Sequence, residues 1–134
     1  MGELTNQLAD GHDANSIDNE HRIQLGMLKA LCDAVTEAQP ASKIHEILNQ
    51  LTAYSELHFT SEELLMRMYA YPDYDDHVLD HEAMTERLSQ ILQRYAAGQD
   101  RMALQTANEM REFLLGHINS RDLALTEYLT TMQT

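Results

Sequence analysis

The chain has 134 residues, of which 43% are hydrophobic and 23% charged, a balance typical of one globular domain rather than a disordered polymer. Asp and Glu outnumber Lys and Arg by 22 to 9, and the resulting net charge of −13 argues against nucleic acid as a partner. No apolar run reaches the ~18–20 residues that a membrane span requires, which argues against insertion in a membrane. The single Cys32 favours a reducing, cytoplasmic location.

The first element in chain order is an expected irregular arm over residues 1–15, which contain Gly2, Gly11 and several polar side chains. A helix is predicted over residues 16–38, because apolar positions then recur at steps of three and four. Pro40 ends this segment and can open the next. The inner stripe of the first helix is Ile17, His21, Leu25, Leu28, Cys32 and Val35.

The next two helices are predicted over residues 41–70 and 74–97, separated by the Tyr71-Pro72 break. Negative charge from Asp75 and Asp76 in the first turn favours the start of the later one. The earlier helix carries Ile44, Ile47, Leu51, Tyr54, His58, Glu62 and Leu65 on one stripe. The later helix carries His77, His81, Met84, Leu88, Ile91 and Tyr95.

A fourth helix is predicted over residues 101–119, after a short connection at Gly98-Gln99-Asp100. Its stripe consists of Ala103, Ala107, Met110, Leu114 and His117. The tail over residues 120–134 is expected to add a helical turn or two. Four amphipathic helices joined by short links predict an all-α, up-down-up-down antiparallel four-helix bundle, with residues 1–134 forming one domain.

Histidines interrupt the apolar stripe of every predicted helix. A lone histidine of this kind is usually a core residue satisfied by a neighbour, but several buried together without partners would be costly. The five that fall on the stripes are His21, His58, His77, His81 and His117. His12 lies in the arm, and His45 is rotated to roughly the opposite side of its helix from His58, so we expect His45 to be solvated.

Depth along the bundle brings the five histidines to one level. His21 and His58 each lie about 18 residues from the first loop, and at ~1.5 Å per residue the two meet. Glu62 and His81 flank the second turn at similar distances, and His81 and His117 lie about equally far from Gly98. All five histidines and Glu62 are therefore predicted to converge in one slab near one end of the bundle.

Asp122 can join this slab only if the last helix is irregular. It follows His117 by five residues, off the helical face, and reaches the others if the helix bulges or ends around Asn119-Ser120. One tetrahedral zinc would use four of the seven residues. Two metals bridged by Glu62 and Asp122 use all seven, and imidazole with carboxylate suits iron. The absence of a Glu-x-x-His pair favours binding O2 over cleaving it.

The four histidine segments resemble the hemerythrin family, and most closely its bacterial branch. The segments are Ile17-Asp18-Asn19-Glu20-His21, His58-Phe59-Thr60-Ser61-Glu62, His77-Val78-Leu79-Asp80-His81 and His117-Ile118-Asn119-Ser120-Arg121-Asp122. The resemblance covers residues 16–122. It implies two iron ions with an oxo or hydroxo bridge. His77, His81 and His117 would bind one ion and His21 and His58 the other, with Glu62 and Asp122 bridging and a position open for O2, or for small anions or NO.

The resemblance also implies an O2 pocket with apolar neighbours that keep water away. Phe59, Leu114 and Ile118 stand at matching positions. Gln24 stands one turn after His21, where the family usually has an aliphatic residue, and its side chain either faces the open iron or leans outward to solvent. The chain also has no Trp, although bacterial members usually carry one in the arm.

The functional hypothesis is reversible O2 binding by a carrier or storage protein that is not an enzyme. The alternative is an O2- or redox-sensing domain of a larger signalling protein, such as a chemoreceptor or a cyclic-nucleotide-synthesising enzyme, with covalent fusion to an output domain. A metal-dependent enzyme, such as a peroxidase or a nitric oxide scavenger, has less support, because the sequence offers no general base beyond the proposed ligands.

Overall fold

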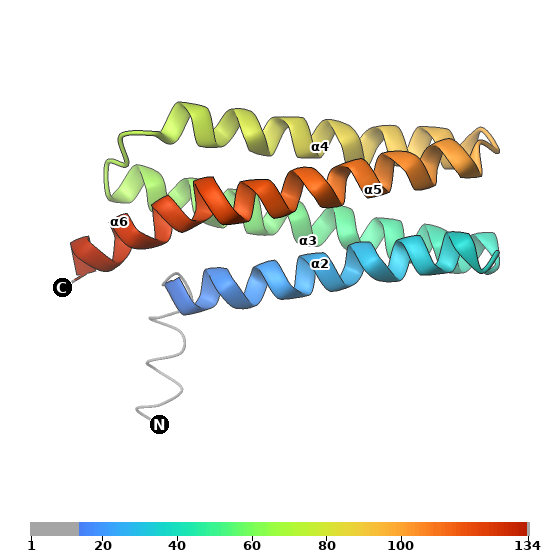
Figure 1. Ribbon diagram of the computed structural model, residues 1–134, viewed down its shortest axis with the longest axis horizontal. Helices are drawn as coiled ribbons and strands as arrows, with labels where there is room; N and C mark the ends of the chain where they lie inside the picture. The colour runs from blue at the N-terminus through green and yellow to red at the C-terminus, as the bar shows by residue number, and fades with distance from the viewer. Residues whose placement is uncertain (1–13, 134) are drawn as a thin grey trace, which may run out of the picture.

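The computed structural model describes the backbone of residues 14–133 and the side chains of residues 19–132. The helices are α2 (Ala14–Thr36), α3 (Ala41–Met68), α4 (Tyr74–Ala96), α5 (Asp100–His117) and α6 (Leu123–Gln133), with a π-helical turn η2 (Ile118–Asp122) between the last two. Figure 1 shows α2 to α5 running alternately in opposite directions, which confirms the predicted bundle. Most of the predicted arm, residues 1–13 with His12, lies outside the described residues. Its last two residues, Ala14 and Asn15, belong to α2.

Two residues after the ends of α2, α3 and α4, the chain passes through the left-handed region, at Ala38 (φ 52°), Ala70 (φ 52°) and Gly98 (φ 77°) respectively. At the last of these, the Gly98 N–H donates to the Tyr95 carbonyl at 3.0 Å and the Gln99 N–H to the Arg94 carbonyl at 2.8 Å. These paired bonds satisfy carbonyls at the helix end in the manner of a Schellman motif, and glycine adopts the required φ without a steric penalty. The chain therefore reverses direction at Gly98 and Gln99, which places α5 antiparallel beside α4.

Two apolar clusters lie at different depths in the bundle. The main core runs along α2 to α5 and includes Leu28, Leu51, Leu88 and Met110. The second, smaller cluster lies at the end of the bundle and consists of Leu65, Met66, Tyr71, Leu125 and Leu129. Along α3 and α4, and along the segment from α5 to α6, the predicted metal ligands lie in the region where these two clusters meet.

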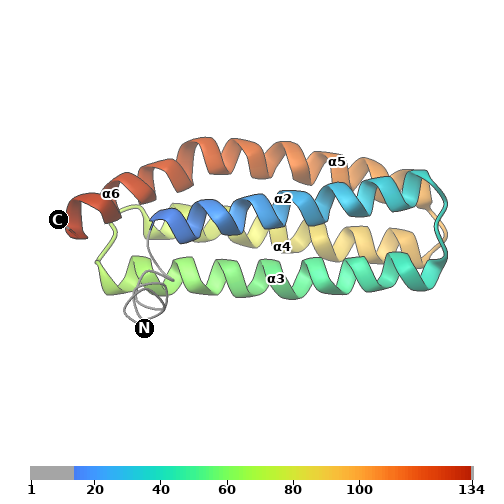
Figure 2. The same cartoon turned by 90° about the horizontal axis from the view of Figure 1, so that it is seen from below.

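The C-terminal tail forms a helix of 11 residues, longer than the turn or two that the sequence predicts. Figure 2 shows α6 bending away from the line of α5. Leu125 and Leu129 are fully buried in the end cluster, and the Tyr128 hydroxyl donates to the Tyr69 carbonyl at 2.7 Å. These contacts stabilise α6 as the cover over one end of the bundle.

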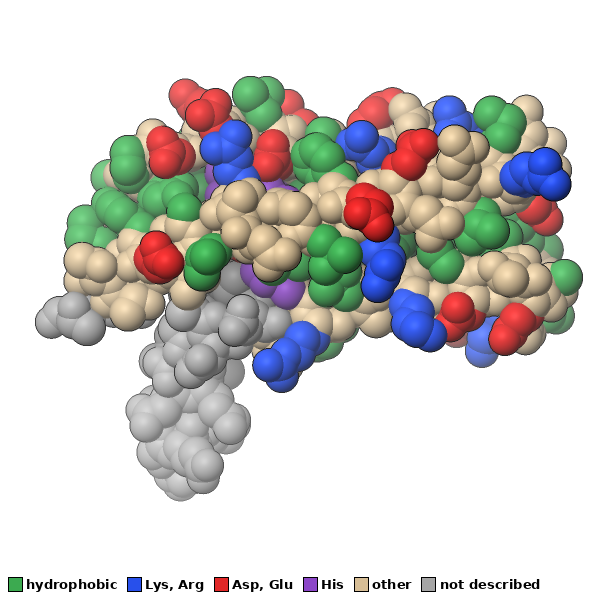
Figure 3. Space-filling view, viewed as in Figure 1, with side chains coloured by type: hydrophobic (Ala, Val, Ile, Leu, Met, Phe, Trp, Pro, Cys, Tyr) green, Lys and Arg blue, Asp and Glu red, His purple; other side chains and the backbone are tan. Residues whose placement is uncertain are grey.

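On the face that Figure 3 shows, acidic, basic and hydrophobic side chains are interspersed, and histidine is visible only in small areas between other side chains. Within residues 14–133, no helix is long and apolar enough to cross a membrane.

Candidate metal centre

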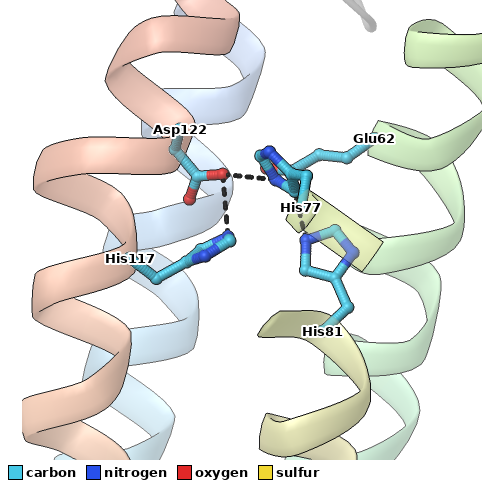
Figure 4. Close-up of side chains that lie close together, drawn as sticks. All are labelled: Glu62, His77, His81, His117 and Asp122. Atoms are coloured by element: carbon cyan, nitrogen blue, oxygen red, sulfur yellow. Dashed lines mark hydrogen bonds and ion pairs between the residues drawn. The ribbon is translucent and has the colours of Figure 1, made fainter. Parts of the chain in front are cut away.

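All seven residues predicted as metal ligands lie together in one buried layer. None of these residues is more than 4% exposed. They come from α2, α3, α4, α5 and η2, and Figure 4 shows five of them pointing toward one another across the bundle. The full set is His21, His58, Glu62, His77, His81, His117 and Asp122.

The π-helical turn η2 brings Asp122 into this layer, which confirms the predicted bulge. In a regular α-helix, five residues rotate a side chain about 140° away from the starting face, so Asp122 would point away from His117. The wider turn over Ile118–Asp122 removes this offset, and Asp122 is 1% exposed. The Ser120 Oγ donates to the Gly116 carbonyl at 2.7 Å across the same turn. Single π-turns within α-helices are frequent at functional sites.

Glu62 divides its two carboxylate oxygens between two sets of histidines. Its Oε2 lies 3.0 Å from His58 Nε2 and 3.4 Å from His21 Nε2. Its Oε1 lies 3.0 Å from His77 Nε2 and 2.9 Å from His81 Nε2. A carboxylate placed in this way has one oxygen available to each of two neighbouring ions.

Asp122 divides its oxygens in the same manner. Its Oδ2 lies 2.7 Å from His21 Nε2, and its Oδ1 lies 3.0 Å from His77 Nε2 and 3.1 Å from His117 Nε2. Despite these short distances, neither Asp122 oxygen nor His117 Nε2 has an aligned hydrogen-bond partner. Buried polar atoms without partners require an explanation, and donors assembled around shared cations provide one.

The donor atoms form two groups that share both carboxylates. The ligand atoms of each group lie within 4.8 Å of one another. The first group is Glu62, His77, His81, His117 and Asp122. The second group is His21, His58, Glu62 and Asp122. A five-residue and a four-residue set with two common carboxylates fit a pair of neighbouring metal ions, the second with one protein ligand fewer.

Three carboxylates outside the donor layer orient three of the imidazoles, and these outer carboxylates were not predicted from the sequence. Each accepts a hydrogen bond from a histidine Nδ1–H on the next helix along the chain, which leaves that ring's Nε2 free to bind a metal. The pairs are His58 with Glu20 at 3.0 Å, His81 with Glu63 at 2.9 Å, and His117 with Asp80 at 2.8 Å. Each outer carboxylate directly precedes or follows a predicted ligand in the sequence, and this adjacency is the signal that could have indicated them.

Electrostatics in the layer favour the charged form of three imidazoles, those of His21, His58 and His77, when no metal is bound. Burial disfavours the charged form of His21, but the adjacent carboxylates of Asp122 and Glu62 outweigh it and raise its pKa to about 9. Neighbouring carboxylates likewise overcome burial and raise the pKa of His77 to about 9 and that of His58 to about 10. Burial opposes ionisation of the Glu62 and Asp122 carboxyl groups. The surrounding imidazoles outweigh this effect and lower the pKa of both groups well below the usual range.

These pKa shifts predict how the metal-free protein responds to pH. Histidines with a raised pKa stabilise the folded protein, and this contribution is complete below pH ~6.5, the histidine pKa in the unfolded chain. The contribution is lost as the pH rises through the folded pKa values of about 9 to 10. The carboxylates of Glu62 and Asp122, whose pKa values are lowered, stabilise the folded protein above pH ~4, and this contribution is lost when stronger acid protonates them. We expect the unfolding temperature of chelator-treated protein, followed by circular dichroism, to be highest between pH ~4.5 and ~6.5 and to fall steadily from pH ~7 to ~10. A constant unfolding temperature from pH 7 to 10 would contradict this expectation.

The bundle and its buried donor layer define a metal-binding helical-bundle protein. The Hemerythrin HHE cation binding domain family matches residues 12–129, and the chain belongs to this family, which confirms the resemblance. The chain is similar to a bacteriohemerythrin of Stenotrophomonas maltophilia, with 32% identity over 81% of this chain and 69% of the relative. It is also similar to bacteriohemerythrins of Methylococcus capsulatus, with 26% identity over 84% and 85%, and Pseudomonas paraeruginosa, with 31% over 79% and 68%. No solved structure matches the chain.

The residues predicted to line an O2 pocket occupy different surroundings. Gln24 does not lean outward to solvent: its side chain is fully buried and its amide donates to Ser55 Oγ at 3.0 Å. Phe59 is 4% exposed and stacks on the ring of His81, with 4.3 Å between centroids. Leu114 is fully buried, and Ile118 is half-buried against the main core. Their role in binding O2 stays a prediction.

His45 lies outside the donor layer, as expected, but it is not fully solvated. Its side chain is half-buried, and its ring meets that of Tyr95 edge-on with 5.4 Å between centroids. The expectation of solvation is wrong because Tyr95, from α4, lies beside this part of α3 and covers one side of the ring.

Proposed function

We propose that this protein binds dioxygen reversibly at a di-iron centre. One ion would be held by His77, His81 and His117 and the other by His21 and His58, with Glu62 and Asp122 bridging. The observation that carries the proposal is the division of each buried carboxylate between two sets of imidazoles. When bound, the iron pair supplies the electrons and the open coordination position for a small ligand such as O2.

The residues of the chain support this role by orienting the donors and excluding water. The outer carboxylates Glu20, Glu63 and Asp80 hold three imidazoles with Nε2 toward the centre. The apolar clusters that meet at the layer limit access of solvent. A donor set of neutral imidazoles with only two bridging carboxylates adds little negative charge, which favours the ferrous pair and suits binding of O2 rather than its cleavage.

We propose an oxygen carrier or store in the cytoplasm, not an enzyme, and the likeness to bacteriohemerythrins supports this assignment. One observation favours the alternative, an O2- or redox-sensing domain fused to an output domain. The amide of Gln24 is buried one turn from His21, and a polar group beside the centre promotes oxidation of the iron pair. The lifetime of the oxygenated protein in air separates these roles, because a carrier requires a long one.

The proposal predicts two iron ions in each chain. Metal analysis of protein loaded with Fe²⁺ without oxygen is expected to give two irons, and the oxidised form is expected to show near-ultraviolet charge-transfer bands without haem bands. The variant His45→Ala serves as the control and should retain both irons, because His45 lies outside both donor groups. One zinc per chain, or no metal, would contradict the proposal.

A further inference from the structure

The layer of side chains next to the histidines, on the side of the main core, is half polar. Its members each stand three residues from a histidine of the metal centre, one on each of α2 to α5, and each is 0% exposed. They are Gln24, Ser55, Met84 and Leu114. The following layer is apolar throughout and consists of Leu28, Leu51, Leu88 and Met110.

The two polar members lie on the same half of the centre. Met84 and Leu114 belong to α4 and α5, the helices that carry the three-histidine group. Gln24 and Ser55 belong to α2 and α3, next to His21 and His58, whose ring centroids are 5.0 Å apart. Each member of the polar pair is three residues from the histidine on its own helix. At 1.5 Å per residue, the polar pair therefore lies about 4.5 Å from these two histidines along the bundle axis.

The polar pair and the bridging carboxylates lie on opposite sides of the two histidines. Along α3, Glu62 follows His58 by four residues, whereas Ser55 precedes it by three. The two-histidine group also has one donor residue fewer than the other group. The polar pair therefore borders the half of the centre that has fewer protein ligands, on the side away from Glu62.

The polar pair retains unused hydrogen-bonding capacity. Gln24 Nε2 donates to Ser55 Oγ at 3.0 Å, which anchors the amide between α2 and α3. This bond uses one of the two N–H groups of the amide, and Gln24 Oε1 has no partner although it is fully buried. Buried polar groups in proteins almost always have a partner, so the unpaired oxygen indicates a water molecule or another donor beside it, while the second N–H of the amide is available to an acceptor such as an anion.

We propose that Gln24, anchored by Ser55, is a specificity-determining residue that hydrogen-bonds a small inorganic anion at the two-histidine half of the centre. The inference rests on the proposed di-iron function. Two cations bridged by two carboxylates have an excess of positive charge, which attracts an anion to the half with fewer protein ligands. An amide N–H there stabilises a charged ligand more than neutral O2, so the pair favours anions where an aliphatic residue would not.

The test is an azide titration of the oxidised, iron-loaded protein, followed by absorption spectroscopy, with the iron content of every variant measured first. Loss of the amide in Gln24→Leu or in Gln24→Met, which has nearly the shape of glutamine, is expected to weaken azide binding about ten- to a hundredfold. The variant Ser55→Ala, which frees the amide from its anchor, should weaken binding about three- to tenfold.

Gln93→Leu is the matched control. Gln93 is exposed, and its amide donates to Ser89 Oγ at 3.3 Å, so this variant removes a similar amide–serine bond far from the centre. Its azide affinity should equal that of the wild type. If wild-type protein did not hold two irons, the proposed function would fail before azide was added, so the two failures are distinguishable.

Thermal unfolding of the metal-free variants separates ligand recognition from simple support of the fold. If Gln24 only joined α2 to α3, Gln24→Met would lower the unfolding temperature and leave azide affinity unchanged, and the proposal would be wrong. We expect instead an unfolding temperature that is equal or higher, because the orphan acceptor is removed, together with weaker azide binding. Loss of iron from both Gln24 variants would also overturn the proposal, since the amide would then support the centre itself.

Discussion

Replacing Glu62 with Ala is expected to empty the metal centre, from two irons per chain to fewer than one. Glu62 is one of two residues shared by both donor groups, and its oxygens contact four of the five imidazoles. Without it, each ion loses a ligand and the two ions lose a bridge. In the metal-free chain, the buried histidines also lose their partner, at a cost of roughly 1–3 kcal/mol for each unsatisfied group. Metal analysis and thermal unfolding of the variant measure both effects.

Two other glutamates of α3 provide graded controls for this experiment. Glu56 is exposed on the same helix, so Glu56→Ala should keep both irons. Glu63 contacts only the outer nitrogen of His81, and Glu63→Ala should lower metal affinity by about ten- to a hundredfold without abolishing binding. If Glu62→Ala retained two irons, the bridging role of Glu62 would be excluded.

The helices and the donor layer were predictable because both depend on short-range patterns. Helix breaks are marked by Pro40, Tyr71-Pro72 and Gly98, and three- and four-residue spacing assigns each side chain to a face. Short connections of similar length force antiparallel neighbours to meet at equal depth. A histidine on a stripe of leucines is therefore predicted to lie in the core at a known depth, and in the structure the five histidines meet in two donor groups that share Glu62 and Asp122.

Features that depend on contacts between helices could not be predicted in this way. Glu20 precedes His21 in the sequence yet contacts His58, because packing of α2 on α3 decides which ring it reaches. The direction of Gln24 depends on Ser55, a residue of another helix. The length of α6 depends on the apolar cluster that receives Leu125. Spacing within one helix is the same whichever of these contacts forms.

Inserting an alanine between Asn119 and Ser120 is expected to destroy the metal centre and unfold the end of the bundle. One added residue rotates everything after it by about 100° relative to α5. Asp122 would then leave the donor layer, and Leu125 and Leu129, both fully buried, would leave the end cluster. The loss of a buried leucine costs ~2–5 kcal/mol, so losing two approaches the ~5–15 kcal/mol total stability of a domain.

Deleting Asn119, which is exposed, is the matched control. The deletion places the aspartate four residues after His117, where a regular α-helix puts it within about 40° of the same face. Leu125 and Leu129 would keep their directions as well, so the deletion variant should retain two irons and unfold near the wild-type temperature. Iron content and circular dichroism of the two variants test this contrast. Equal loss of iron from both would show that the centre requires the π-turn itself, and not only a carboxylate facing His117.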